Sequence, residues 1–96
     1  MDLQPRQRAI IQEILHKIVP DLEIRCFGSR VTGGAKAHSD LDLALVSNAA
    51  IEPETLIRLK LAFEESDLPF RVEVQEWRLL DPQFKAQIEP EAEIWK

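Results

Sequence analysis

The segment that decides the fold spans residues 22–46 and reads LEIRCFGSRVTGGAKAHSDLDLALV. Polar and apolar residues alternate over 22–27, which is the pattern of a half-buried strand, and Gly28-Ser29 ends it. A second strand is predicted over 40–46, after a loop that contains Gly33-Gly34. A short helix after Ser29 is compatible with this pattern. We therefore expect two strands joined by a glycine-containing loop at the centre of the domain.

The flanking segments predict three helices and a third strand. Apolar residues recur every three or four positions over 7–18, which indicates an amphipathic helix between Pro5 and Pro20. A second helix starts at Pro53, a third strand covers 70–76, and a short helix begins at Asp81 or Pro82. The order α-β-β-α-β-α predicts a small α/β domain of the α+β type, with a short mixed sheet flanked by helices.

Length and composition predict one soluble domain over residues 1–96. The chain is 45% hydrophobic and 30% charged, as in globular proteins. Its longest apolar run covers residues 43–46, whereas a membrane span needs about 20 residues. The first residues lack the pattern of a secretory signal, and a single cysteine, Cys26, excludes an internal disulfide. We expect a cytoplasmic protein in which Cys26 is a small core residue.

The charge balance disfavours direct binding to nucleic acids. Twelve basic and seventeen acidic residues give a formal net charge of −5, and a general nucleic-acid binder needs a basic face to displace phosphate counterions. A nucleotide held through a divalent metal remains compatible with this charge.

Two aspartates at the start of the second strand are candidate metal ligands. Alternation places Asp40 and Asp42 on one face, about 6.6 Å apart along the strand. Adjacent carboxylates repel one another unless a proton or a cation intervenes, and Mg²⁺ prefers oxygen ligands. The alternative is that both carboxylates are solvated at a frayed strand end.

Gly28-Ser29 and Glu73 are candidates for the same site. Glycine allows close backbone approach to a ligand, and the Ser29 hydroxyl can donate to a phosphate. Glu73 lies opposite the core-facing valines of the third strand, together with Arg71 and Gln75. If that strand pairs with the second, Glu73 reaches the aspartates as a proton acceptor or metal ligand. The alternatives are an ordinary turn and a solvated glutamate.

Gly28-Ser29, ten residues and then Asp40-x-Asp42 resemble the minimal nucleotidyltransferases of the DNA polymerase β superfamily. The resemblance extends over nearly the whole chain, because Val72-Glu73-Val74 and residues 81–84 are similar to the family's third acidic strand and closing helix. It implies catalytic and metal-binding roles for Asp40, Asp42 and Glu73. It also implies that Gly28, Ser29 and Arg30 bind the nucleotide.

The resemblance further implies transfer of a nucleoside monophosphate, with AMP from ATP expected, assisted by two Mg²⁺ ions. Many short members are antitoxins that adenylylate an HEPN-domain toxin, so we expect such a toxin as partner in a hetero-oligomer. Two departures weaken the match: Thr32 stands where the family often has arginine, and Glu73 where it more often has aspartate. The alternative is therefore a catalytically weak or inactive antitoxin, a binding module that neutralises its partner by occlusion.

The remaining candidate residues receive structural predictions. His16 and His38 have no partner at metal-binding spacing. Trp77 and Trp95 are expected to pack, although Ile94 and Trp95, beside an acidic tail, have the alternative of meeting a partner.

Overall fold

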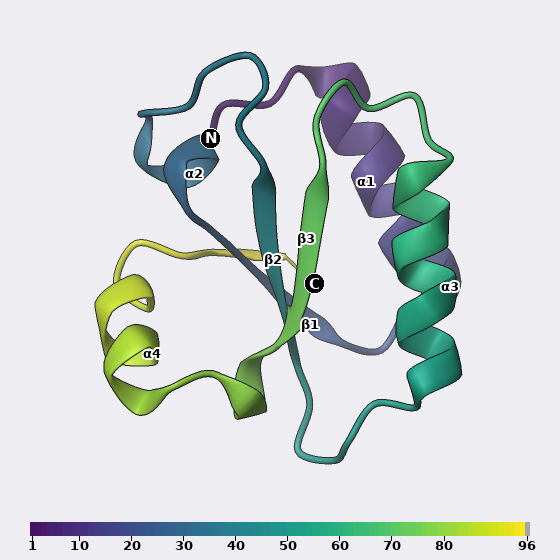
Figure 1. Ribbon diagram of the computed structural model, residues 1–96, viewed down its shortest axis with the longest axis vertical. Helices are drawn as coiled ribbons and strands as arrows, with labels where there is room; N and C mark the ends of the chain where they lie inside the picture. The colour runs from purple at the N-terminus through teal and green to yellow at the C-terminus, as the bar shows by residue number, and fades with distance from the viewer. Residues whose placement is uncertain (96) are drawn as a thin grey trace.

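The computed structural model describes residues 1–95, which form a four-stranded sheet with helices on both faces (Figure 1). In chain order the elements are α1 (Pro5–Ile18), β1 (Glu23–Phe27), α2 (Ser29–Thr32), β2 (Leu41–Val46), α3 (Pro53–Glu64), β3 (Val72–Glu76), the 3₁₀ turn η1 (Trp77–Leu79), α4 (Pro82–Ile88) and β4 (Glu93–Trp95). Every predicted helix and strand is present, including the short helix after Gly28. The third strand begins at Val72, two residues later than predicted.

The sheet is mixed, as expected, with the strand order β3-β2-β1-β4. β1 pairs with β2 and with β4 in antiparallel fashion, whereas β2 and β3 run parallel. The register places Asp42 between Phe27 on β1 and Glu73 on β3. The end of β1 and the starts of β2 and β3 therefore meet at one end of the sheet.

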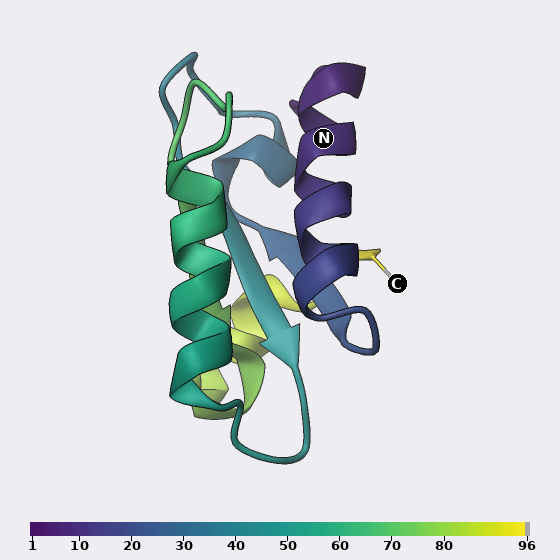
Figure 2. The same cartoon turned by 90° about the vertical axis from the view of Figure 1, so that its right-hand side faces the viewer.

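One face of the sheet carries the hydrophobic core. Figure 2 shows α1 and α3 side by side over this face, with α4 behind the sheet. The alternation predicted for β2 is confirmed, because Leu41, Leu43 and Leu45 are fully buried. Ile11 and Leu15 of α1 and Leu59 and Phe63 of α3 complete the centre of this core. No helix among residues 1–95 is long and apolar enough to cross a membrane.

Strand β4 is the element that the sequence analysis missed. Three residues are too few to show a period of two, and Pro90 with the surrounding glutamates favours a loop. The strand forms because it pairs with β1 and because Trp95 is buried, with the Arg8 guanidinium 4.9 Å above its ring. Trp95 thus packs within the domain, and the suggestion that it meets a partner is wrong, whereas the neighbouring Ile94 is 52% exposed.

Candidate functional site

The structure brings the three predicted carboxylates together at one end of the sheet. Asp42 on β2 and Glu73 on β3 are direct register partners, and Asp40 immediately precedes β2. Leu41 donates its backbone N–H to the Arg71 carbonyl at 2.9 Å, which fixes the start of β2 against β3. The condition under which Glu73 reaches the aspartates, pairing of the second and third strands, is met.

Arg71 bridges two of these carboxylates. Its Nη2 lies 3.1 Å from Oδ2 of Asp40, and its Nε lies 3.3 Å from Oε2 of Glu73. The hydrogen bond to Asp40 raises the pKa of Arg71 further above its ordinary value, and the charges of Asp40 and Glu73 act in the same direction. The strand alternation predicted Arg71 on the same face as Glu73. The ion pair between Arg71 and Asp40 depends on the pairing of β2 with β3, and no local sequence pattern indicates it.

Asp42 lies in a crowded, partly desolvated electrostatic environment. Partial burial raises the pKa of its carboxyl, the charges of Asp40 and Glu73 raise it further, and Arg71 opposes them. Such crowding of like charges in a partly desolvated position favours a cation or a proton between the oxygens. Positions of this kind are frequent in catalytic and metal-binding sites.

Gly28 lies directly against Asp42. Its backbone angles, φ 89° and ψ −169°, fall in a region open almost only to glycine. A Cβ atom at this position would lie under 3.0 Å from Oδ2 of Asp42, closer than real side-chain carbons approach. The turn between β1 and α2 therefore requires glycine both for its conformation and for the space that the Asp42 carboxylate occupies.

A cavity of about 470 Å³ opens beside these groups. Its walls are formed by the turn after β1, by the end of the sheet that carries Asp42, and by α4. The lining residues are Phe27, Gly28, Ser29, Thr32, Asp42, Gln75, Phe84, Gln87, Ile88 and Glu91. The sequence analysis placed Gly28, Ser29 and Asp42 at the site but missed the contribution of α4. A helix signature indicates that α4 forms and does not indicate which face of the sheet it covers.

Arg30 lies apart from this cavity in a structural position. Only 5% of the residue is exposed, and its guanidinium lies 3.8 Å above the Phe70 ring. The guanidinium donates to four backbone carbonyls, which are those of Asp2 at 2.9 Å, Lys36 at 3.4 Å, Ala37 at 3.0 Å and Ser39 at 2.7 Å. These bonds occupy the donors that would have faced a phosphate. The structure therefore corrects the assignment of Arg30 to nucleotide binding, because its side chain braces the loop before β2.

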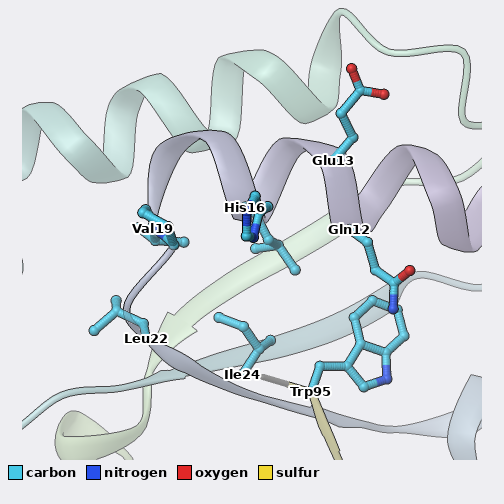
Figure 3. A pocket seen from close by; sticks show the side chains of 9 residues that line it. Gln12, Glu13, His16, Val19, Leu22, Ile24 and Trp95 are labelled. Atoms are coloured by element: carbon cyan, nitrogen blue, oxygen red, sulfur yellow. The ribbon is translucent and has the colours of Figure 1, made fainter.

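A second cavity, of about 440 Å³, lies on the opposite side of the sheet, between α1 and strands β1 and β4. Figure 3 shows Ile24 and Trp95 of the sheet facing Gln12 and His16 of α1. Its lining is largely apolar, with Glu13 as its carboxylate. This cavity lacks the clustered carboxylates and the glycine turn, so the candidate active site is the one beside Asp42.

The carboxylate cluster fits a hard divalent cation by its donor chemistry. Asp40, Asp42 and Glu73 supply the oxygen ligands that Mg²⁺ prefers, and the Arg71 guanidinium already serves as a cation between two of them. In the present arrangement, no three His, Cys, Asp or Glu side chains within residues 1–95 form a preformed metal cage. Binding of a metal would therefore require Arg71 and the carboxylates to adjust.

Comparison with known proteins identifies relatives of the whole domain. Residues 8–94 match the family model described as a nucleotidyltransferase domain. The chain is 44% identical over 85 residues to the "Probable protein adenylyltransferase MntA" of Haemophilus influenzae, and the match covers 88% of this chain and 75% of that protein.

Two solved structures share the fold. A toxin–antitoxin crystallised with AMP-PNP superposes with a TM-score of 0.73 at 22% identity, over 91% of this chain and 71% of that one. A mutant of the toxin–antitoxin MntA–HpeT gives a TM-score of 0.71 at 22% identity, over 93% and 71% of the two chains. At this level of identity the two structures support the fold alone.

Proposed function

Because this chain belongs to the nucleotidyltransferase domain family, we propose that it transfers AMP from ATP to a hydroxyl group of a partner protein. The observation that carries the proposal is the placement of Asp42 between the Gly28 turn and Glu73. This places a ligand-accessible turn, a cavity and three carboxylates at one end of the sheet. The relative named a probable protein adenylyltransferase supports a protein as the acceptor and AMP as the transferred group.

The residues divide the chemistry between them. Asp40, Asp42 and Glu73 would hold Mg²⁺, which in such sites neutralises phosphate charge and polarises the phosphorus. Ser29 binds the phosphate tail through its hydroxyl, beside the backbone of Gly28. Arg71 offers the positive charge that the buried Arg30 cannot present.

Transfer itself exchanges one phosphorus–oxygen bond for another. The acceptor oxygen forms a bond to the α-phosphorus, the bond to the leaving pyrophosphate breaks, and the hydroxyl proton passes to the Glu73 carboxylate. Positioning and electrostatic stabilisation supply most of the acceleration in reactions of this class. The side chain of Glu73 is one methylene longer than the family's more common aspartate, which moves its carboxylate relative to the other two.

We propose a helical HEPN-domain toxin as the partner. The antitoxin role of many short nucleotidyltransferases supports this assignment, as does the 44% identity to a relative named a probable protein adenylyltransferase. AMP attached to a toxin hydroxyl would add a bulky, charged group to that surface. The chain would thus act as an antitoxin through a covalent modification.

The test is the intact mass of a co-expressed HEPN-domain partner, after incubation with this protein, Mg²⁺ and ATP. We expect a gain of one or more AMP units, which is lost with Asp42→Asn. Asp67→Asn is the matched control, because Asp67 is an exposed aspartate that pairs with Arg6 away from the cavity. An unchanged mass with the wild-type protein would refute the proposed activity.

Neutralisation by occlusion is the second candidate function. One observation favours it: the Arg71 guanidinium pairs with Asp40 and Glu73, two of the three carboxylates. An occluding antitoxin inhibits its partner stoichiometrically without ATP, and Asp42→Asn neutralises as well as the wild type. If the Asp42→Asn protein binds the toxin without neutralising it, occlusion is refuted.

A further inference from the structure

We propose that α4 is the nucleoside-binding wall of the cavity beside Asp42, and that the Phe84 ring contacts the base of the bound nucleotide. The inference rests on the proposed function, because it takes the occupant to be a nucleotide. It adds a base-binding surface on an element that contributes no residue to the glycine turn or to the carboxylate cluster.

The cavity joins two regions of different chemistry. One part of its wall is polar and carries Gly28, Ser29 and Asp42, whereas another part carries the apolar Phe84 and Ile88. A nucleotide has the same two-part character, with a charged phosphate tail and a flat, largely apolar base. The volume of about 470 Å³ is within the range of small-molecule sites.

Phe84 is held in place although part of it remains exposed. Its ring meets Phe27 edge to face, with ring centroids 5.8 Å apart and an interplanar angle of 79°. Asp81 caps α4 by accepting hydrogen bonds from the backbone N–H groups of Gln83, at 3.1 Å, and Phe84, at 3.3 Å. Phe27 is the register partner of Asp42. The Phe84 ring therefore packs on the direct neighbour, across the strand pair, of a proposed metal ligand.

Core packing does not account for the apolar face of α4. None of the residues Pro82–Ile88 is buried, and Phe84 is 37% exposed. An aromatic ring that is fixed yet accessible is suited to stack on a base, an interaction that tolerates any base because each has a π-face. Gln75 and Gln87 add side-chain amides that can donate to and accept from the polar edge of the base.

The charges along the cavity set the orientation of the nucleotide. Among the described residues of the lining there is no lysine or arginine, and the carboxylate besides Asp42 belongs to Glu91, just beyond α4. Glu91 disfavours a triphosphate near the end of α4, whereas an uncharged base is not repelled there. The phosphates are therefore placed at the glycine turn, where Asp42 can act through a metal, and the base at α4.

The test compares two ligands that differ by the nucleoside. Dissociation constants for Mg²⁺-ATP and Mg²⁺-tripolyphosphate are measured by calorimetry on the wild-type chain and on Phe84→Ala. We expect Phe84→Ala to weaken ATP binding about 10-fold or more, as for the loss of one base–aromatic contact, and to leave tripolyphosphate binding unchanged. Phe84→Leu keeps an apolar side chain against Phe27 and is expected to lose affinity for ATP without unfolding.

Ile57→Ala is the control, because Ile57 is an exposed apolar residue on α3 outside the cavity. Equal weakening of both ligands by the Phe84 substitutions, or no effect on ATP, overturns the inference while the proposed function stands. Equal affinities of the wild-type chain for ATP and tripolyphosphate also overturn it. A wild-type chain that binds neither ligand overturns the proposed function, and the inference with it.

Discussion

Gly28→Ala tests the idea that the glycine turn and the Asp42 carboxylate form one unit. The substitution has two separate costs. The backbone at φ 89° and ψ −169° is strained for any residue with a side chain, and the new methyl group would meet Oδ2 of Asp42 at under 3.0 Å. Gly33 and Gly34, which follow α2, separate these costs.

The three substitutions form a graded series. Gly34→Ala has no positive φ and nothing within 4 Å, so we expect almost no effect on stability. Gly33→Ala has φ 97° but open space, and left-handed conformations cost an alanine about 1–2 kcal/mol. Gly28→Ala adds the clash to a strain of about 1–3 kcal/mol, so it should destabilise the fold most. A loss of about 2 kcal/mol lowers the Tm by about 8–16 °C in a domain of this size.

The assays are thermal unfolding and AMP transfer to the partner. Transfer should fall about 100-fold or more with Gly28→Ala, since a displacement of roughly 1 Å in a reactive group has that effect, and it should change little with Gly34→Ala. Combining Gly28→Ala with Asp42→Ala removes the clash but not the strain. The double-mutant cycle should then show a coupling of about 1 kcal/mol. No coupling, or a Gly28→Ala protein as stable as Gly33→Ala, would refute the reasoning.

Three further outcomes follow from buried or crowded groups. The raised native pKa of Asp42 costs stability where the carboxyl is ionised, so Asp42→Asn should raise the Tm at pH 7. This gain in Tm should vanish as the pH falls below the ordinary value of 3.8, where the carboxyl is protonated in both the native and the unfolded state. Arg30→Met should cost about 2–4 kcal/mol in urea unfolding, because it leaves several partly buried carbonyl oxygens without their donor. Arg30→Lys should not restore the loss. Burial raises the pKa of Cys26 from 9.0 to about 12. The thiol therefore ionises more readily in the unfolded chain, and the free energy of unfolding should fall as the pH rises from 9 to 12. Alkylation of Cys26 at pH 8 should proceed only as fast as the protein opens.

The sequence predicted the elements because its periodic patterns are local. Leu41, Leu43 and Leu45 alternate with polar or small residues, and the structure buries all three. The positions of Gly28 directly after the first strand and of Asp42 on the second followed from the same patterns. Strand β4 escaped prediction because its pairing with β1 and the burial of Trp95, more than any local pattern, stabilise three residues.

The roles of the two arginines near the site required the structure. Arg30 belongs to the motif Gly28-Ser29-Arg30, so the family resemblance implied that it binds the nucleotide, whereas Arg71 is 31 positions from Asp40 and received no such role. The fold reverses this expectation. Arg30 turns inward toward the carbonyls of the loop before β2, and the parallel pairing of β2 with β3 places Arg71 beside Asp40. The direction of the Arg30 side chain and the pairing of β2 with β3 decide these contacts, and a short sequence motif specifies neither of them.

The division of the sheet into two faces predicts that folding and ligand binding can be varied separately. The core face is filled by α1 and α3, whose Ile11 and Leu59 are fully buried against β2. The other face carries the site and is covered by α4, which contributes no buried residue. Substitutions on α4 therefore remove little buried apolar surface and should alter nucleotide affinity more than stability. Substitutions under α1 and α3 create cavities and should do the reverse, so α4 is the element on which nucleotide preference can change without loss of the fold.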